Sequence, residues 1–254
     1  MPLPGPKPRI ITSDDFTDGE LRALVSALAH TGTLVRETVA IPGSDRSVDV
    51  IRPCDIETLL DQSAGDPEQN LPYWAEIWPS GLALATAILR QPGLIAGKPV
   101  LELGSGVGIT AAVAMSQGAC LVATDYAPES LILARITSRL SGGGEPETRQ
   151  VNWRSPDADM LQADGSRWPV VLAADVLYEQ RDVEPILDVF DRIVAPGGLV
   201  WLADQDRRPA NHALELAAGR GWRISSTSMS AEWADLKDAG VVVRVHQMWR
   251  SGPP

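Results

Sequence analysis

The feature that most constrains this chain is an apolar segment that runs directly into three alternating glycines. In PVLELGSGVG (99–108), the apolar run predicts a buried strand, and Gly104, Gly106 and Gly108 predict the turn that follows it. Glycine has no Cβ, so backbone N–H groups in such a turn can approach a ligand closely. The small-residue segment ITAAVAMSQGA (109–119) then predicts a helix. This order of elements is typical of an α/β domain that binds a ligand at the turn.

The alternation of strands and helices continues to the end of the chain. Further helices are predicted at 128–140, 183–198 and 208–221, and further strands at 120–125, 148–153, 168–178, 199–205, 222–229 and 240–250. Continuous apolar strands joined by helices indicate a mostly parallel sheet that is covered on both faces. The sequence therefore predicts a doubly wound α/β domain.

A different pattern precedes this domain. Helical spacing of apolar residues predicts a helix at 13–30, and two alternating segments, TLVRETVAI (33–41) and SVDVIRP (47–53), predict a β-hairpin. We therefore divide the chain into an N-terminal appendage, residues 1–70, and a domain at 71–254.

Composition excludes several classes of function. The net charge of −11 disfavours a nucleic-acid partner, and no apolar run is long enough to cross a membrane. The N-terminus lacks the apolar core of a secretory signal, so we expect a soluble, cytoplasmic protein. Cys54 and Cys120 lie far apart and are expected to pack as small apolar residues. His30, His212 and His246 are equally scattered, so neither a metal site nor a histidine-based triad is expected.

An acidic residue at the end of the second strand narrows the choice of ligand. Asp125 lies 21 positions after Gly104, where doubly wound folds place the acid that binds a ribose diol. The dinucleotide pattern G-x-G-x-x-G would need glycine at position 109, where Ile109 stands. The chain instead carries E-x-G-x-G-x-G from Glu102, the pattern of S-adenosylmethionine-dependent methyltransferases. That ligand has a cationic ammonium, which an acid near the turn would attract.

The chain resembles a narrower group, the seven-β-strand protein-lysine methyltransferases, which includes the electron-transfer-flavoprotein β-subunit and calmodulin lysine methyltransferases. The resemblance rests on PYWAEIWPSGLALA, VLELGSGVGI, VATDYAPESL, NWRSP and AADVLYEQRD, in the family's order. It implies a Rossmann-like, seven-stranded sheet, S-adenosyl-L-methionine as cofactor, and N-methylation of a lysine in a protein substrate.

The resemblance also implies which residues bind the cofactor. They are Trp78, Glu102, Gly104, Ser105, Gly106, Asp125, Tyr126, Asn152, Trp153 and Ala174. Glu102 and the glycine turn would face the methionine end of the cofactor, and Asp125 its ribose. Tyr126, Asn152 and Trp153 would surround the adenine. Several relatives carry an acid where Asn152 stands, so that contact would lose its charge here.

Asp175 and Tyr178, in the D-x-x-Y of AADVLYEQRD, are the predicted catalytic residues. They follow a strand expected beside the first one, where ligands of open α/β sheets bind. By resemblance, the carboxylate and the ring would orient a lysine amine for attack on the methyl group. Alternatives stay open: Asp175 caps a turn with Tyr178 packed behind it, the acceptor is a small-molecule amine, or the chain is a catalytically silent binding protein. The oligomeric state is not predicted.

Overall fold

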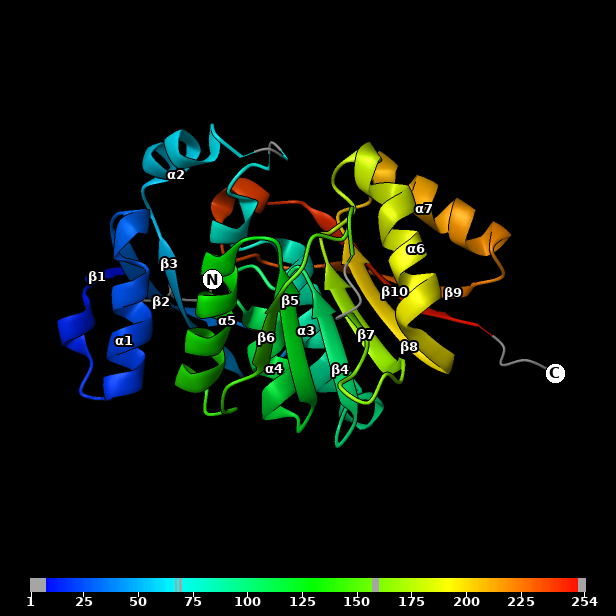
Figure 1. The fold of residues 1–254 in the computed structure, drawn as a ribbon, viewed down its shortest axis with the longest axis horizontal. Coiled ribbons are helices and arrows are strands. Elements are labelled where there is room, and N and C mark those ends of the chain that lie inside the picture. The colour runs from blue at the N-terminus through cyan, green and yellow to red at the C-terminus, as the bar shows by residue number, and fades with distance from the viewer. Residues whose placement is uncertain (1–7, 67, 69, 157–159, 251–254) are drawn as a thin grey trace.

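The larger of the two sheets in the described residues carries the glycine turn at the end of β4, Pro99–Leu103 (Figure 1). The computed structural model describes residues 8–66, 68, 70–156 and 160–250. The sheet has the order β6-β5-β4-β7-β8-β10-β9, in which β10 is antiparallel to both neighbours and the other pairs are parallel. Its strands are β4 (Pro99–Leu103), β5 (Cys120–Asp125), β6 (Glu147–Gln150), β7 (Trp168–Ala174), β8 (Val194–Asp204), β9 (Arg223–Ser230) and β10 (Val242–Trp249). The predicted seven-stranded, mostly parallel sheet is confirmed.

Helices cover both faces of this sheet, because successive strand residues point to opposite sides. Val100 packs into a core shared with α3 (Pro79–Arg90), α4 (Ile109–Ser116) and α5 (Pro128–Leu140). Its neighbour Leu101 packs into a second core shared with α6 (Val183–Ile193) and α7 (Arg208–Gly219). Both side chains are fully buried.

The N-terminal region forms a second, three-stranded antiparallel sheet that packs against α5 (Figure 1). It consists of β1 (Arg9–Ile11), β2 (Leu34–Ala40) and β3 (Ser47–Pro53), with α1 (Gly19–Ala27) beside it. The β2–β3 hairpin is confirmed, whereas β1 and α2 (Ile56–Ser63) have no counterpart in the sequence analysis. The helix expected from residue 13 begins later, because Asp18 caps it by accepting bonds from the N–H groups of Glu20 and Leu21. The domain boundary at residue 70 stays a prediction.

The centre of the large sheet brings three polar strand ends together. β4 lies between β5 and β7, and all three run parallel. Gly104 directly follows β4, Asp125 ends β5, and Asp175 directly follows β7. The backbone N–H of Asp175 donates to the carbonyl of Ala203 at 2.8 Å, which fixes the turn after β7 to β8. The expected adjacency of the first and fourth strands is confirmed.

One expectation about isolated side chains is wrong. Cys54 and Cys120 are both exposed, because each stands at a strand terminus rather than inside a core. His246, to which the sequence analysis assigned no partner, is fully buried in β10, where its ring contacts Asp204 at 2.9 Å and Ser226 at 2.7 Å. Both partners lie on neighbouring strands, which no spacing in the sequence reveals. Within the described residues, no helix has the length and apolarity to cross a membrane, and no three His, Cys, Asp or Glu side chains gather as metal ligands.

Candidate active site

A cavity of about 330 Å³ opens at the carboxyl ends of β4, β5 and β7. Most of the residues predicted for the site line it. They are Trp78, Gly104, Gly106, Asp125, Tyr126, Asn152, Trp153, Ala174, Asp175 and Tyr178. Glu102 and Ser105 are buried beneath the turn and do not line the cavity. The individual roles assigned to these residues stay predictions.

The glycine turn closely approaches the turn after β7. Gly104 has a φ of +71°, and a Cβ built there would lie 2.9 Å from Cγ1 of Val176 and 3.6 Å from the Trp153 ring. Glycine is therefore needed at this position for both conformation and space. Val176 directly follows Asp175, so the segment that carries the predicted acceptor-binding acid lies against the predicted donor-binding turn.

Two carboxyl groups give this end of the cavity its acidic character. Asp125 accepts bonds from the Gly106 N–H at 3.1 Å and the Ser130 hydroxyl at 2.7 Å through Oδ2, and from the Ala127 N–H at 3.0 Å through Oδ1. Burial raises the pKa of Asp125 despite these bonds. Burial, together with the charge of Asp125, raises the pKa of Glu102 well above its usual value. Glu102 Oε2 has no hydrogen-bond partner among the described residues. A cationic ligand near this turn would stabilise the ionised forms of these two neighbouring carboxyl groups.

Two acidic residues of the N-terminal region, Asp66 and Glu68, contact residues that line the cavity. The Tyr126 hydroxyl donates to Asp66 at 2.7 Å, and this bond raises the pKa of Tyr126 to about 12. The Asn152 amide donates to Glu68 Oε1 at 3.1 Å. Asn152 therefore has an acidic neighbour from the N-terminal region, at a position where several relatives carry an acid in the sequence itself. Neither Asp66 nor Glu68 is predicted by the sequence, because each lies in a polar stretch without periodicity.

A buried ion pair between Arg154 and Asp182 lies behind Trp153. The Trp153 indole N–H donates to Asp182 Oδ1 at 2.9 Å, and Arg154 Nε donates to the same oxygen at 2.6 Å. Asp182 is fully buried, and these donors compensate for the water that its carboxylate loses. Trp153 thereby lines the cavity and also packs on the adjoining core.

Asp175 stands at the centre of the acceptor side and is 8% exposed. Its φ of +58° belongs to the left-handed region, which aspartate tolerates better than most residues. Oδ1 lies 3.0 Å from Arg207 Nη1, and Oδ2 accepts a bond from Gln205 Nε2 at 2.5 Å. Burial raises the pKa of Asp175, while the charge of Arg207 and the bond from Gln205 oppose that rise. Asp175 is therefore a desolvated carboxyl whose ionised form depends on its partners.

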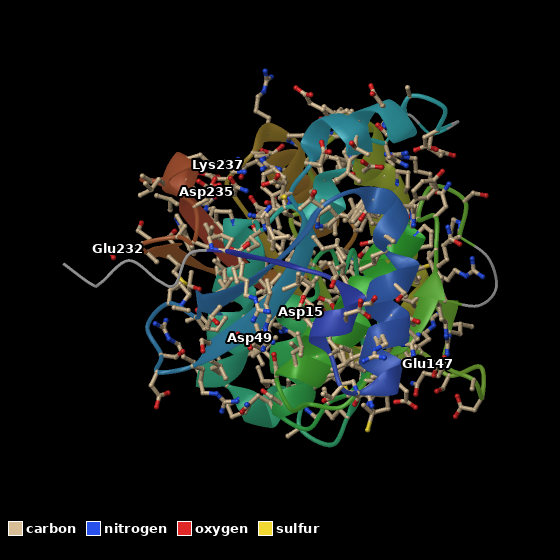
Figure 2. All side chains as sticks on the ribbon, turned by 90° about the vertical axis from the view of Figure 1, so that its left-hand side faces the viewer. Asp15, Asp49, Glu147, Glu232, Asp235 and Lys237 are labelled. Atoms are coloured by element: carbon tan, nitrogen blue, oxygen red, sulfur yellow. The ribbon has the colours of Figure 1, made fainter. Side chains whose placement is uncertain are left out.

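Aromatic rings surround the approach to Asp175. Tyr73 makes edge contacts with Tyr178, at a centroid distance of 5.3 Å, and with Trp78, at 5.9 Å. Burial raises the pKa of Tyr178, so its hydroxyl stays protonated. Arg207 Cζ and Lys237 Nζ lie 5.5 Å and 5.8 Å from the Trp78 ring centroid. Lys237 comes from the segment between β9 and β10, and Figure 2 shows it beside Asp235. These faces suit a cationic or polar amine.

Tyr73 and Arg207 are two of the cavity residues that the sequence analysis missed, and Val176 and Glu179 are others. Tyr73 lies in the segment PYWAEIWPSG, in which the sequence analysis singled out a tryptophan, Trp78, and not the tyrosine. Arg207 lies three residues beyond the end of β8, and strand ends are where the ligands of such sheets bind. Its position just after a strand end was the one signal in the sequence that could have identified Arg207 as a site residue.

Comparisons with known proteins agree with this geometry. A family model described as lysine methyltransferase matches residues 69–218. The electron transfer flavoprotein beta subunit lysine methyltransferase of Danio rerio is 34% identical over 110 residues, which is 43% of this chain and 40% of that protein. The EEF1A lysine methyltransferase 3 of Mus musculus is 28% identical over 164 residues, which is 64% of this chain and 66% of that protein. The first relative is thus matched over less than half of its length.

A solved structure shares the fold. The magnesium protoporphyrin IX methyltransferase of Synechocystis, solved with bound S-adenosylmethionine, superposes with a TM-score of 0.50 at 15% identity. The match covers 67% of this chain and 78% of that one. At this identity the similarity establishes the fold alone, and it agrees with the strand order described above.

Proposed function

The chain belongs to the lysine methyltransferase family, whose model matches more than half of its 254 residues, and on that premise we propose that it transfers a methyl group from S-adenosylmethionine to a lysine amine of another protein. One observation supports the proposal most strongly. The segment of Asp175 lies against the glycine turn, with Val176 Cγ1 2.9 Å from the Cβ position of Gly104. Donor-binding and acceptor-binding elements therefore meet in one cavity.

The residues present fit S-adenosylmethionine. Glu102 offers a buried carboxyl oxygen without a partner, which suits a nearby ammonium group, and Gly104 leaves the turn open to a ligand. Asp125 would hold the ribose, while Tyr126 and Trp153 line the wall where the adenine would lie. When bound, the cofactor supplies an electrophilic methyl group on a sulfonium.

The chain's own residues would bind and orient the acceptor. Methyl transfer needs an uncharged amine whose lone pair points at the methyl carbon, so orientation supplies much of the rate. The Asp175 carboxylate can accept an N–H of the amine, and the rings of Tyr73, Trp78 and Tyr178 can enclose the aliphatic part of the lysine. Once methylated, the amine would pass its surplus proton to Asp175 or to water.

Binding of the cofactor is tested by calorimetry with S-adenosylhomocysteine. We expect saturable binding to the wild type, and a large loss of affinity in Asp125→Asn. The exposed Asp164 provides a matched control, because Asp164→Asn makes the same change away from the cavity. Absence of binding to the wild type would overturn the proposal at its first step.

The acceptor is tested by incubating the enzyme and labelled S-adenosylmethionine with the host proteome. We expect label in one or a few protein bands, and loss of that label with Asp175→Asn but not with Asp164→Asn. Label found only in small metabolites would exclude a protein substrate and leave a small-molecule methyltransferase.

A further inference from the structure

Arg207 is the nearest cation to the predicted acceptor-binding acid, and neither the sequence motifs nor the comparisons assign it a role. It precedes α7 and lines the cavity with a side chain that is 31% exposed. Its Nη1 lies 3.0 Å from Asp175 Oδ1, and its Cζ lies 5.5 Å from the Trp78 ring centroid. A guanidinium therefore lies between the carboxylate and the aromatic face where the acceptor amine is expected.

The other charges around Asp175 make this cation necessary. Asp204, at the end of β8, opposes ionisation of Asp175, whereas Arg207 and the bond from Gln205 favour it. At the rim, the charge of Arg207 also acts on Asp238, whose own neighbours are Lys237, Asp235 and Glu76. A carboxyl group that is almost fully buried beside another acid binds a proton unless a cation lies against it.

We propose that Arg207 is a positioning residue that keeps Asp175 ionised and the acceptor lysine uncharged at neutral pH. The proposal rests on the proposed function. Each Asp175 oxygen already has one partner, Arg207 or Gln205, and the carboxylate keeps further lone pairs for an amine N–H. A protonated Asp175 would be a weaker acceptor, because one of its oxygens would become a hydroxyl donor. An ionised Asp175 without Arg207 would instead hold the acceptor as an ammonium ion, which has no lone pair for attack. A fixed positive charge prevents both outcomes, because it disfavours proton binding at every site near it.

The pH profile of methyl transfer separates this role from a structural one. The variants are Arg207→Gln, which removes the charge, Arg207→Lys, which keeps it, and Arg208→Gln, which removes the neighbouring exposed charge. For the labelled protein band, we expect the acidic limb of kcat/KM to move upward by about one pH unit or more in Arg207→Gln. At a pH on that limb, kcat/KM of Arg207→Gln should be about tenfold lower than that of the wild type. At alkaline pH the two values should coincide. Arg207→Lys should stay within about half a unit of the wild type, and Arg208→Gln should match it.

A loss of equal size at every pH in Arg207→Gln would show a structural role and overturn the proposal. An unshifted profile would overturn it as well. Calorimetry with S-adenosylhomocysteine on each variant checks that the cavity is intact.

A second readout needs no acceptor. Carbon NMR of labelled aspartate, in the protein saturated with S-adenosylhomocysteine, reports the titration of Asp175, assigned by its absence in Asp175→Asn. We expect an ionised Asp175 in the wild type at neutral pH and a higher titration midpoint in Arg207→Gln. A protonated Asp175 in the wild type, or coincident midpoints, would overturn the proposal even if Arg207→Gln folds poorly. If the wild type labels no protein, the proposed function fails, whereas this titration still decides the role of Arg207.

Discussion

Gly108→Ala tests whether the third glycine of the turn is required for the close approach of two helices. Gly108 has a φ of +83°, and a Cβ there would lie 2.5 Å from Cα and 3.2 Å from N of Ala134 in α5. Both are backbone atoms, so α4 and α5 must separate to admit a methyl group. Left-handed strain costs about 1–2 kcal/mol, and overpacking adds about 1–3 kcal/mol.

Gly118→Ala is the matched control. Gly118 also has a φ of +83°, but nothing lies within 4 Å of its Cβ position. Its replacement should cost the strain alone, about 1–2 kcal/mol. We expect Gly108→Ala to unfold at a lower urea concentration than Gly118→Ala, with a melting temperature lower by about 2–4 °C for each additional kcal/mol. Equal destabilisation by the two substitutions would refute the interpretation that helix contact demands this glycine.

Three further predictions follow from how far particular side chains are buried or exposed. The raised pKa of Glu102 means that its stabilising contribution is present below its unfolded pKa and is lost as pH rises through the folded one. Glu102→Gln should therefore stabilise the free protein at alkaline pH and lose that advantage at acidic pH, as measured by urea unfolding at both. Arg154→Met leaves the fully buried Asp182 without its cation and should cost about 3 kcal/mol in the same assay, whereas Arg154→Lys should cost less. Cys54 and Cys120 are exposed, so both should react with an alkylating agent in the native protein at rates near those of the unfolded chain, as measured by mass spectrometry.

The sequence carries most of the information on the central sheet because strands buried on both faces must be continuously apolar. The glycine turn and Asp125 were predictable for a related reason. A turn that brings backbone within reach of a ligand leaves few choices at Gly104, and a strand end fixes where Asp125 can lie. Asp175 and Tyr178 were found through family likeness, and the parallel β4–β7 pair explains why they meet the same cavity.

The remaining parts of the site depend on contacts between distant segments. Asp66 and Glu68 of the N-terminal region bind Tyr126 and Asn152, and no local pattern in the sequence encodes these contacts. Arg207 resembles any surface arginine until β8 is placed beside β7. Helix α1 begins later than predicted because Asp18, rather than the earlier acidic residues, caps its N–H groups. Long-range pairing therefore supplies the charges that surround the motifs.

The measurement that tests the central claim most directly is mass spectrometry of a proteome incubated with this enzyme and S-adenosylmethionine bearing a deuterated methyl group. The account predicts deuterated methyl on the side-chain nitrogen of a lysine, in a small set of proteins, and its absence when Asp175→Asn replaces the wild type. Deuterated methyl on oxygen, on arginine, or only in small molecules would contradict it.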